Sequence, residues 1–501
     1  MRRVLALGLL GLAAAGCAVG PSYKRPDTGT PVNWRPASAI TDSLGPFYDS
    51  LATHRDTIAL DPAAPAGEDT NAAMALQADT VPDLAWFDLL ADPALRELVD
   101  SALFANRDIR IAVARIDEFR GLAGVAKSEL FPQLFLNGEA GRVKNRLGTA
   151  VHYNYLQVTA DLQWELDFWG RIRRSSEAAK SDLLASQEGQ RVVILSLVGD
   201  VAIAYLHLRQ LDLSLEVSRR TLAANLETLR LARRRFNEGL ISELDVRRFE
   251  SSVAGPAASV AQFEGQITQT ENLLSLLVGR NPGSIVRGRA LTEVLGTLTV
   301  PAQLPESLLE RRPDVREAEA ALHAATARIG AAKGAQLPVI SVTGDYGTFA
   351  TRTSDLGKAQ SETYQIFGGV SIPLFTGGRL SSQVDVAEAR AEQARYGYEQ
   401  TVLVALREAE DALAGIRSSR NQVIAEQTQV DALRRALHLA ELRYQAGASS
   451  YLDLLDAQRS LFVAELELAD AQGQEATAAV TLYRALGGGW PVSPADSVAA
   501  P

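Results

Sequence analysis

Two kinds of hydrophobic periodicity alternate along this chain. The first is a seam in which apolar residues recur at alternating spacings of three and four, a repeat that predicts supercoiled α-helices. Its members are Ile194, Leu197, Val201, Ala204, Leu208, Leu211, Leu215, Ser218, Leu222, Asn225, Leu229, Ala232 and Phe236. No proline interrupts residues 171–237, so a single helix of about 100 Å is possible at about 1.5 Å per residue.

The same seam recurs 208 residues later in the chain. Its members are Val402, Ala405, Ala409, Ala412, Ile416, Ser419, Val423, Glu426, Val430, Leu433, Leu437, Ala440 and Tyr444. The glycines that follow the two seams, Gly239 and Gly447, keep the same offset, and each is predicted to form a turn before a second helical stretch. Because the seams and the glycines that follow them recur at the same offset, the sequence indicates an internal duplication with units of about 200 residues.

The second periodicity is a strict alternation of apolar and polar residues. Leu156, Val158, Ala160, Leu162, Trp164 and Leu166 alternate with polar side chains, which fits a transmembrane β-strand and also a half-buried hairpin of a soluble domain. Partner strands are expected after Pro132 and Pro338, and a fourth strand over residues 364–372.

Four strands in one chain cannot close a membrane barrel, because such barrels begin at about eight strands. An open sheet edge in lipid would leave backbone groups unpaired. If the strands lie in a membrane, several copies must therefore share one barrel. Two copies give eight strands and three give twelve, and the pattern does not decide between them.

The N-terminus carries the features of a secretory signal. Met1-Arg2-Arg3 is followed by an unbroken run of apolar residues and glycines, residues 4–16, and then by Cys17. The sequence before Cys17 resembles the cleavage box of bacterial lipoproteins, in which the cysteine is lipidated and becomes the new terminus. No later segment has about 18 consecutive apolar residues, so no transmembrane helix is expected.

Composition and charge narrow the function classes. The chain has 501 residues, of which 47% are apolar, and a net charge of −10. This negative net charge makes nucleic acid an unexpected main partner, because nucleic-acid binding requires a basic patch. With one cysteine and five scattered histidines, no metal-ligand spacing occurs and neither a metal nor another cofactor is expected. No nucleophile-elbow or phosphate-loop pattern is present, so an enzyme is not expected.

Three stretches resemble outer membrane efflux lipoproteins. They are Cys17-Ala18-Val19-Gly20-Pro21-Ser22-Tyr23, the run 304–316 with its Arg311-Arg312-Pro313-Asp314 core, and residues 482–490. These proteins form the NodT/OprM branch of the TolC-like outer membrane factor family, in tripartite RND efflux systems. The resemblance covers roughly residues 17–490.

The resemblance implies an α+β membrane protein. The expected fold is a trimeric twelve-stranded transmembrane β-barrel with four strands per chain, continued by a long α-helical coiled-coil barrel in the periplasm. The expected function is a passive export duct for small molecules such as drugs and toxic compounds, lying in the outer membrane with a large periplasmic part. The implied partners are a periplasmic adaptor protein, an inner-membrane RND-type pump and outer membrane lipid, with a lipid on Cys17 as the only covalent group.

The resemblance also places a constriction at the periplasmic tip of the second hairpin. Asp453 and Asp456 match the two acidic positions there. On one helix face, repeated by symmetry, they would form stacked carboxylate rings that attract cations. From the residues alone, two solvated carboxylates or a helix cap explain the same pair.

Closure of the duct in this family involves links between helices at the tip. Asp245 and Tyr444 stand at the matching positions. Ser449 replaces an arginine partner that a well-studied branch of the family has at that place. The resemblance therefore implies tip links through Asp245, Tyr444 and Ser449, with other contacts in place of the ionic one.

The expected organisation along the chain has six parts. They are a signal peptide (1–16), a lipid-anchored, partly disordered extension (17–81), a first repeat (82–282), an equatorial linker (283–304), a second repeat (305–490) and a C-terminal tail (491–501). Residues 37–80, rich in Ala, Asp, Thr and Pro, depart from the usual family layout.

Two other functions share part of this pattern. A lipid-anchored periplasmic coiled-coil scaffold would explain the seams and the lipoprotein start, but gives no reason for alternating strands. A duct for type I protein secretion would explain the whole architecture with a different cargo. Reconstitution of ion-conducting pores separates both ducts from the scaffold.

Overall fold

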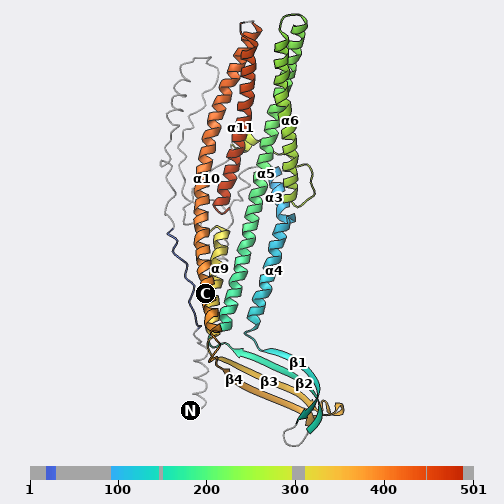
Figure 1. Cartoon of the computed structure of the whole chain (residues 1–501), viewed down its shortest axis with the longest axis vertical. Coiled ribbons are helices and arrows are strands. Elements are labelled where there is room, and N and C mark those ends of the chain that lie inside the picture. The colour runs from blue at the N-terminus through green and yellow to red at the C-terminus, as the bar shows by residue number, and fades with distance from the viewer. Residues whose placement is uncertain (1–17, 30–91, 146–150, 296–310, 447, 489–501) are drawn as a thin grey trace. The chain divides into compact units, whose positions relative to one another are not determined.

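The computed structural model describes residues 18–29, 92–145, 151–295, 311–446 and 448–488 (Figure 1). The helices are α3 (Pro93–Ala105), α4 (Arg107–Ser128), α5 (Arg171–Asn237), α6 (Glu243–Leu277), α7 (Leu291–Leu295), α9 (Pro313–Gly334), α10 (Arg379–Gln445) and α11 (Tyr451–Ala485). The strands are β1 (Gln133–Asn145), β2 (Val151–Leu166), β3 (Val339–Ala350) and β4 (Glu362–Ser371). Two short 3-10 helices, η3 (Thr353–Asp355) and η4 (Ala359–Ser361), lie between β3 and β4.

The chain folds into two compact units, and each contains parts of both sequence repeats. We call the first the sheet unit; it consists of the described parts of Met1–Thr28, Arg110–Arg191 and Pro313–Val402. The second, the hairpin unit, consists of the described parts of Gly29–Ile109, Val192–Arg312 and Leu403–Pro501. Cys17 and residues 37–80 lie outside the described residues.

The two long predicted helices are confirmed. α5 and α10 each contain 67 residues without a break. Most members of the two seams are buried, including Val201, Leu208, Val402 and Ala409 at 0% exposure. A repeat averaging 3.5 residues keeps one stripe against neighbouring helices along the whole length, which is why no other signal is needed to specify helices this long.

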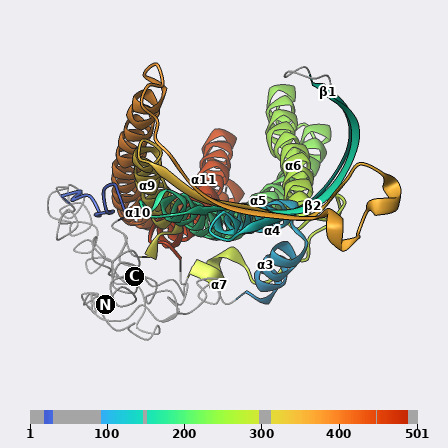
Figure 2. The same cartoon turned by 90° about the horizontal axis from the view of Figure 1, so that it is seen from below.

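The four predicted strands are also confirmed, and they form one antiparallel sheet in the order β1-β2-β3-β4. Figure 2 shows the sheet as a curved ribbon. The register places Leu136 opposite Ala160, Ala160 opposite Tyr346, and Tyr346 opposite Tyr364. Because side chains on paired residues point to the same face of a sheet, the apolar positions of all four strands share one face.

That apolar face is open to the surroundings, whereas the opposite face is polar. Leu136 is 78% exposed and Tyr364 is 74% exposed. On the polar face, Asp161 is paired with Asp345 in the register and accepts a 2.5 Å hydrogen bond from the Asn137 amide. A sheet with one exposed apolar face and one polar face separates lipid from water. Its outer strands, β1 and β4, have no further strand partner among the described residues.

The core of the hairpin unit joins α3, α5, α6, α7 and α11 around residues of zero or near-zero exposure. An 18-residue stretch of α5 has a mean hydropathy of 1.7, apolar enough to cross a membrane by composition, and half of it is buried in the structure. The amino-acid sequence alone gives no expectation of a transmembrane helix, because no segment after the N-terminal run has about 18 consecutive apolar residues. Val201, Tyr205 and Leu208 of α5 lie in this core at 0% exposure, which makes the stretch a core helix by its packing.

The two arginines of the Arg-Arg-Pro-Asp run have a packing role in the hairpin unit. Arg312 is 7% exposed, donates to the Ala485 carbonyl at 3.0 Å and pairs with Glu408 at 2.7 Å. Gly487 has φ +89° and lies against the Arg311 and Arg312 backbone, where a Cβ would approach to 3.3 Å. Two of the stretches that carry the family resemblance therefore contact each other.

Residues 18–28, which we call the strap, dock on the sheet unit. The Val19 amide donates to the Trp169 carbonyl at 3.0 Å. Gly20 crosses Gly330 so closely that a Cβ on Gly20 would lie 2.4 Å from the Gly330 Cα. Arg25 donates twice to Glu319, at 2.7 and 2.5 Å. The strap is therefore held by backbone contact at one end and by an ion pair at the other.

Candidate functional site: the helical tip

The first tip turn is built around Gly239. Its φ is +74°, a conformation that side chains rarely adopt. The Leu240 amide donates to the Arg235 carbonyl and the Gly239 amide to the Phe236 carbonyl, both at 2.9 Å. These two bonds are those of a Schellman motif, which ends a helix with glycine in the left-handed region. α5 therefore ends where the sequence predicts.

The second tip turn repeats one of these bonds at the same offset. The Ala448 amide donates to the Arg443 carbonyl at 2.8 Å. Gly447 itself lies outside the described residues. The second helical stretch predicted after each turn is confirmed, and α6 and α11 each contain 35 residues.

Both second helices begin with a capping box. Ser242 accepts from the Asp245 amide, and the Asp245 carboxylate accepts from the Ser242 amide, each at 3.2 Å. In α11 the Asp453 carboxylate accepts from the Ser450 amide at 3.2 Å. Each aspartate thus satisfies a backbone N–H that the helix leaves free. A Ser-x-x-Asp spacing in the sequence is the signal for this arrangement.

A small apolar core joins the two hairpins at the tip, and we call it the tip core. Its buried members are Leu229, Ala232, Val246, Phe249, Tyr451 and Leu454. The rings of Phe249 and Tyr451 lie 3.6 Å apart between centroids, and burial raises the pKa of the Tyr451 phenol far above its usual value. The tip core therefore connects α6 with the start of α11.

One polar contact reinforces this connection. Arg235, in the last turn of α5, donates to the Tyr444 hydroxyl at 3.1 Å, and its guanidinium lies 5.3 Å from the Tyr444 ring centroid. The structure thus brings Tyr444 to Arg235, a residue that the sequence analysis does not single out. Asp245 is engaged in its own helix, through the cap and with Arg248 at 3.8 Å.

The remaining predicted tip residues differ in their environments. The Ser449 hydroxyl oxygen is buried without a hydrogen-bond partner among the described residues. Asp453 and Asp456 are both exposed at the start of α11. Asp456 has no ion pair within the described part of the chain. Its charge is therefore not neutralised by a neighbour within that part of the chain.

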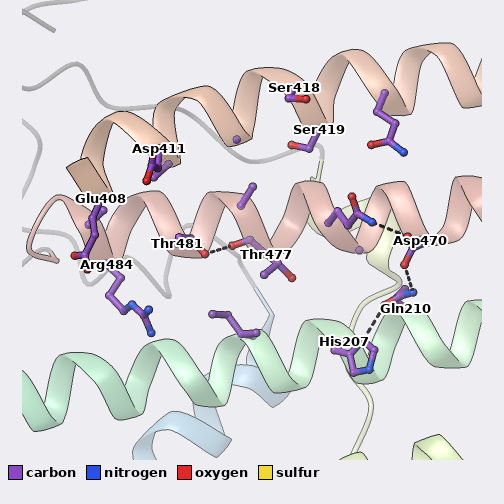
Figure 3. Close-up of a pocket in the computed structure, with 18 residues that line it drawn as sticks. His207, Gln210, Glu408, Asp411, Ser418, Ser419, Asp470, Thr477, Thr481 and Arg484 are labelled. Carbon is purple, nitrogen blue, oxygen red and sulfur yellow. Dashed lines mark hydrogen bonds between the residues drawn. The ribbon is translucent and has the colours of Figure 1, made fainter. Parts of the chain in front are cut away.

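An open cavity of about 760 Å³ lies farther along the hairpin unit, between α5, α10 and α11 (Figure 3). Its lining combines apolar surface with polar side chains, among which Gln210 donates to Asp470 at 3.0 Å and interacts with His207 at 2.8 Å. His207 and Gln210 lie about 200° and 140° around α5 from Tyr205, which packs in the core at 0% exposure. These two polar side chains therefore lie on the side of α5 away from its core.

No group of three or more His, Cys, Asp or Glu residues is placed to hold a metal ion among the residues that the structure describes.

The comparisons with known proteins fit this geometry. The family of outer membrane efflux proteins matches residues 98–280 and 304–488, one match in each predicted repeat. The solvent efflux pump outer membrane protein SrpC of Pseudomonas putida is 37% identical over 411 residues, covering 80% of this chain and 87% of that protein. The cation efflux system protein CusC of Escherichia coli is 32% identical over 480 residues, covering 96% and 97%.

Solved structures agree with the sequence relatives. The crystal structure of the open state of the Neisseria gonorrhoeae MtrE outer membrane channel has a TM-score of 0.80 and 30% identity, covering 94% of this chain and 98% of that one. Such relatives are trimeric channels, which confirms the predicted twelve-stranded barrel with a helical continuation, its outer membrane location and its adaptor and pump partners. The chain therefore belongs to the outer membrane efflux protein family and is one subunit of an efflux channel.

Proposed function

We propose that the channel is closed at the helical tip and that Asp453 and Asp456 form its constriction. The pair is exposed where α10 turns into α11, and the tip core with the Arg235–Tyr444 contact holds the two hairpins together. In a trimer, three copies of each aspartate make two carboxylate rings. Opening requires the hairpins to move apart, so the tip core opposes it.

The exposed start of α11 is the observation that carries this proposal. Asp453 also caps the helix, and capping alone would explain one aspartate. Asp456 is beyond the first turn and has no ion pair among the described residues, so capping gives no reason for it.

Neutralising both carboxylates tests the constriction. In planar bilayers, Asp453→Asn with Asp456→Asn is expected to lower the cation-over-anion permeability ratio several-fold, because the rings lose their charge. Asparagine keeps an oxygen that can accept the Ser450 amide, so α11 keeps its cap. The control is Asp431→Asn on α10 with Glu467→Gln on α11, which removes the same charge about four helical turns away from the tip. Unchanged selectivity in the first variant places the aspartates outside the constriction.

The cargo consists of small organic compounds in this proposal. The names of the relatives point to solvents for SrpC and to cations for CusC. This chain has 2 methionines and 1 cysteine, which are few ligands for soft metal cations. Transport through the duct is passive and involves no catalysis, so its energy comes from the inner-membrane pump.

Cys17 carries a lipid that anchors the chain in this proposal. The strap begins at the next residue, and Ala18 lies against Gly170, where a Cβ on Gly170 would come 2.9 Å from the Ala18 Cα. The attached lipid would therefore start beside the junction of β2 and α5. Labelled palmitate is expected in the full chain and absent from Cys17→Ala. Equal labelling of both proteins would contradict the anchor.

A further inference from the structure

A second cavity, of about 460 Å³, lies between α9 and α10 in the sheet unit. We call it the arginine cavity, because the side chains of Arg328, Arg379 and Arg390 contribute to its lining. Ala325, Val386 and Ala387 supply apolar surface. Three guanidinium groups and a small apolar floor thus converge from two helices on one space.

Two of these three charges are not compensated. Arg328 forms an ion pair with Asp182. Arg379 and Arg390 are exposed, and neither has an ion pair or side-chain hydrogen bond among the described residues. The cavity therefore carries a net positive charge that the protein itself does not neutralise.

The first repeat shows how such charges are neutralised elsewhere in this chain. Arg171, at the start of α5, corresponds to Arg379 at the offset of 208 residues. It donates twice to Glu165, at 3.0 and 2.8 Å. Asp167 accepts the backbone amides of Ile172 and Arg173 at 3.1 and 2.8 Å. Two carboxylates thus satisfy the beginning of α5.

The second repeat lacks both of these carboxylates. The positions that correspond to Glu165 and Asp167 are Pro373 and Phe375, and α10 has no acidic residue in its first turn. The position that corresponds to Asp182 is Arg390, so a negative charge has become positive. The free N-terminus of α10 adds further positive potential. The start of α10 therefore lacks the carboxylates that neutralise the start of α5, and an anion from solution can take their place.

The cavity lies on the side of α9 away from the strap. Glu319, His323 and Gly330 face the strap. Ala325 and Arg328 lie about 200° and 140° around the helix from His323. Because the strap leads to the proposed lipid on Cys17, which must lie outside the cylinder, the arginine cavity opens toward the interior of the duct.

We propose that the arginine cavity binds a small organic anion, a carboxylate, sulfonate or phosphate with an apolar body. Guanidinium groups match such heads by paired, charge-assisted hydrogen bonds. The apolar floor accommodates the body of the ligand. The same head chemistry occurs in soluble cargo and in anionic phospholipid, and the interior position favours soluble cargo. The proposal concerns binding and does not depend on the constriction at Asp453 and Asp456.

Calorimetric titration of the full trimer in a neutral maltoside detergent tests this site. The probe is naphthalenesulfonate, and naphthalenesulfonamide is the uncharged counterpart of the same size. Arg379→Gln with Arg390→Gln is expected to weaken sulfonate binding about tenfold or more, because two charged donors are lost. Binding of the sulfonamide is expected to stay within about twofold, since only the neutral body is recognised.

A matched control removes two exposed arginines from the same helix. Arg435→Gln with Arg443→Gln changes the net charge equally and is expected to leave sulfonate binding within about twofold. Elution as a trimer and an unchanged helical spectrum establish that each variant folds. Equal sulfonate affinity in wild type and the Arg379/Arg390 variant overturns the site, as does an equal loss in the control.

Lipid competition distinguishes the two sources of the anion. The titration is repeated in nanodiscs of phosphatidylcholine alone and of phosphatidylcholine with phosphatidylglycerol. Sulfonate binding that is the same in both supports soluble cargo as the ligand. Competition by phosphatidylglycerol that disappears in the Arg379/Arg390 variant supports the same anion site and assigns it to a lipid headgroup. Competition that persists in the variant contradicts the site.

Discussion

Replacing Phe249 with alanine is expected to lower the free energy of opening of the tip by about 3–5 kcal/mol, the range for truncating a buried phenylalanine. Phe249 is 2% exposed, and its ring lies against Tyr451 of the other hairpin. The substitution leaves a cavity and removes the ring contact between Phe249 and Tyr451. Native-state hydrogen exchange of the amides in residues 229–249 is expected to accelerate roughly a hundredfold to a few thousandfold.

Two variants show whether the effect comes from the tip core. Phe236→Ala removes the same side chain from a site 40% exposed at the end of α5, and is expected to change exchange little. Phe249→Leu keeps most of the volume and is expected to cost less than about 1.5 kcal/mol. If the tip core holds the channel shut, Phe249→Ala also raises the resting conductance in bilayers. Normal exchange rates in Phe249→Ala would show that the two hairpins are held together by other contacts.

Replacing Asp92 with alanine is expected to destabilise the hairpin unit by about 3–5 kcal/mol, since a buried acceptor of three hydrogen bonds is lost. Asp92 is 3% exposed. Its carboxylate accepts from the Tyr205 hydroxyl at 2.8 Å and from the amides of Ala94 and Arg289 at 2.9 and 3.1 Å. A Cβ on Gly288 would lie 1.9 Å from the Asp92 carboxylate, so the loop is fitted tightly around it.

The loss is read from pulse proteolysis in urea. Asp92→Asn retains a side-chain oxygen that can accept from the Ala94 amide and is expected to lose about half as much stability as Asp92→Ala. Asp100→Ala on the same helix removes an exposed carboxylate and serves as the control; its expected cost is within about 0.5 kcal/mol. Equal urea midpoints for Asp92→Ala and Asp100→Ala would show that the buried network contributes nothing.

The periodic elements of this fold could be predicted from the sequence, because their information is local. Each seam ends one residue before its helix does, at Phe236 in α5 and at Tyr444 in α10, and the proline-free stretch 171–237 coincides with the whole of α5. The alternation in residues 156–166 lies within β2 (Val151–Leu166). β4 is less evident in the sequence because Phe367 and Gly368 interrupt the alternation, and only the pairing with β3 makes the strand clear.

Contacts between distant residues could not be predicted in this way. Asp92 and Tyr205 are 113 residues apart, and Arg235 and Tyr444 are 209 apart; nothing in either local pattern links the partners. The Ser-x-x-Asp spacing at the starts of α6 and α11 could have predicted both helix caps from the sequence. Asp453, however, belongs to this capping pattern and also stands at one of the family's acidic positions. The charge on Asp453 and its role in the helix start therefore need separate experiments.

The two outer edges of the sheet, which have no strand partner in the part of the chain that the structure describes, have a genetic consequence. A chain with a mutation that prevents strand pairing at β1 or at β4 still has one edge that can pair. It can therefore assemble with wild-type copies and leave the barrel open at one subunit interface. When healthy and damaged alleles are expressed equally and mix at random, only about one ring in eight contains three healthy copies. An edge mutation in this gene would thus be dominant over a normal second copy.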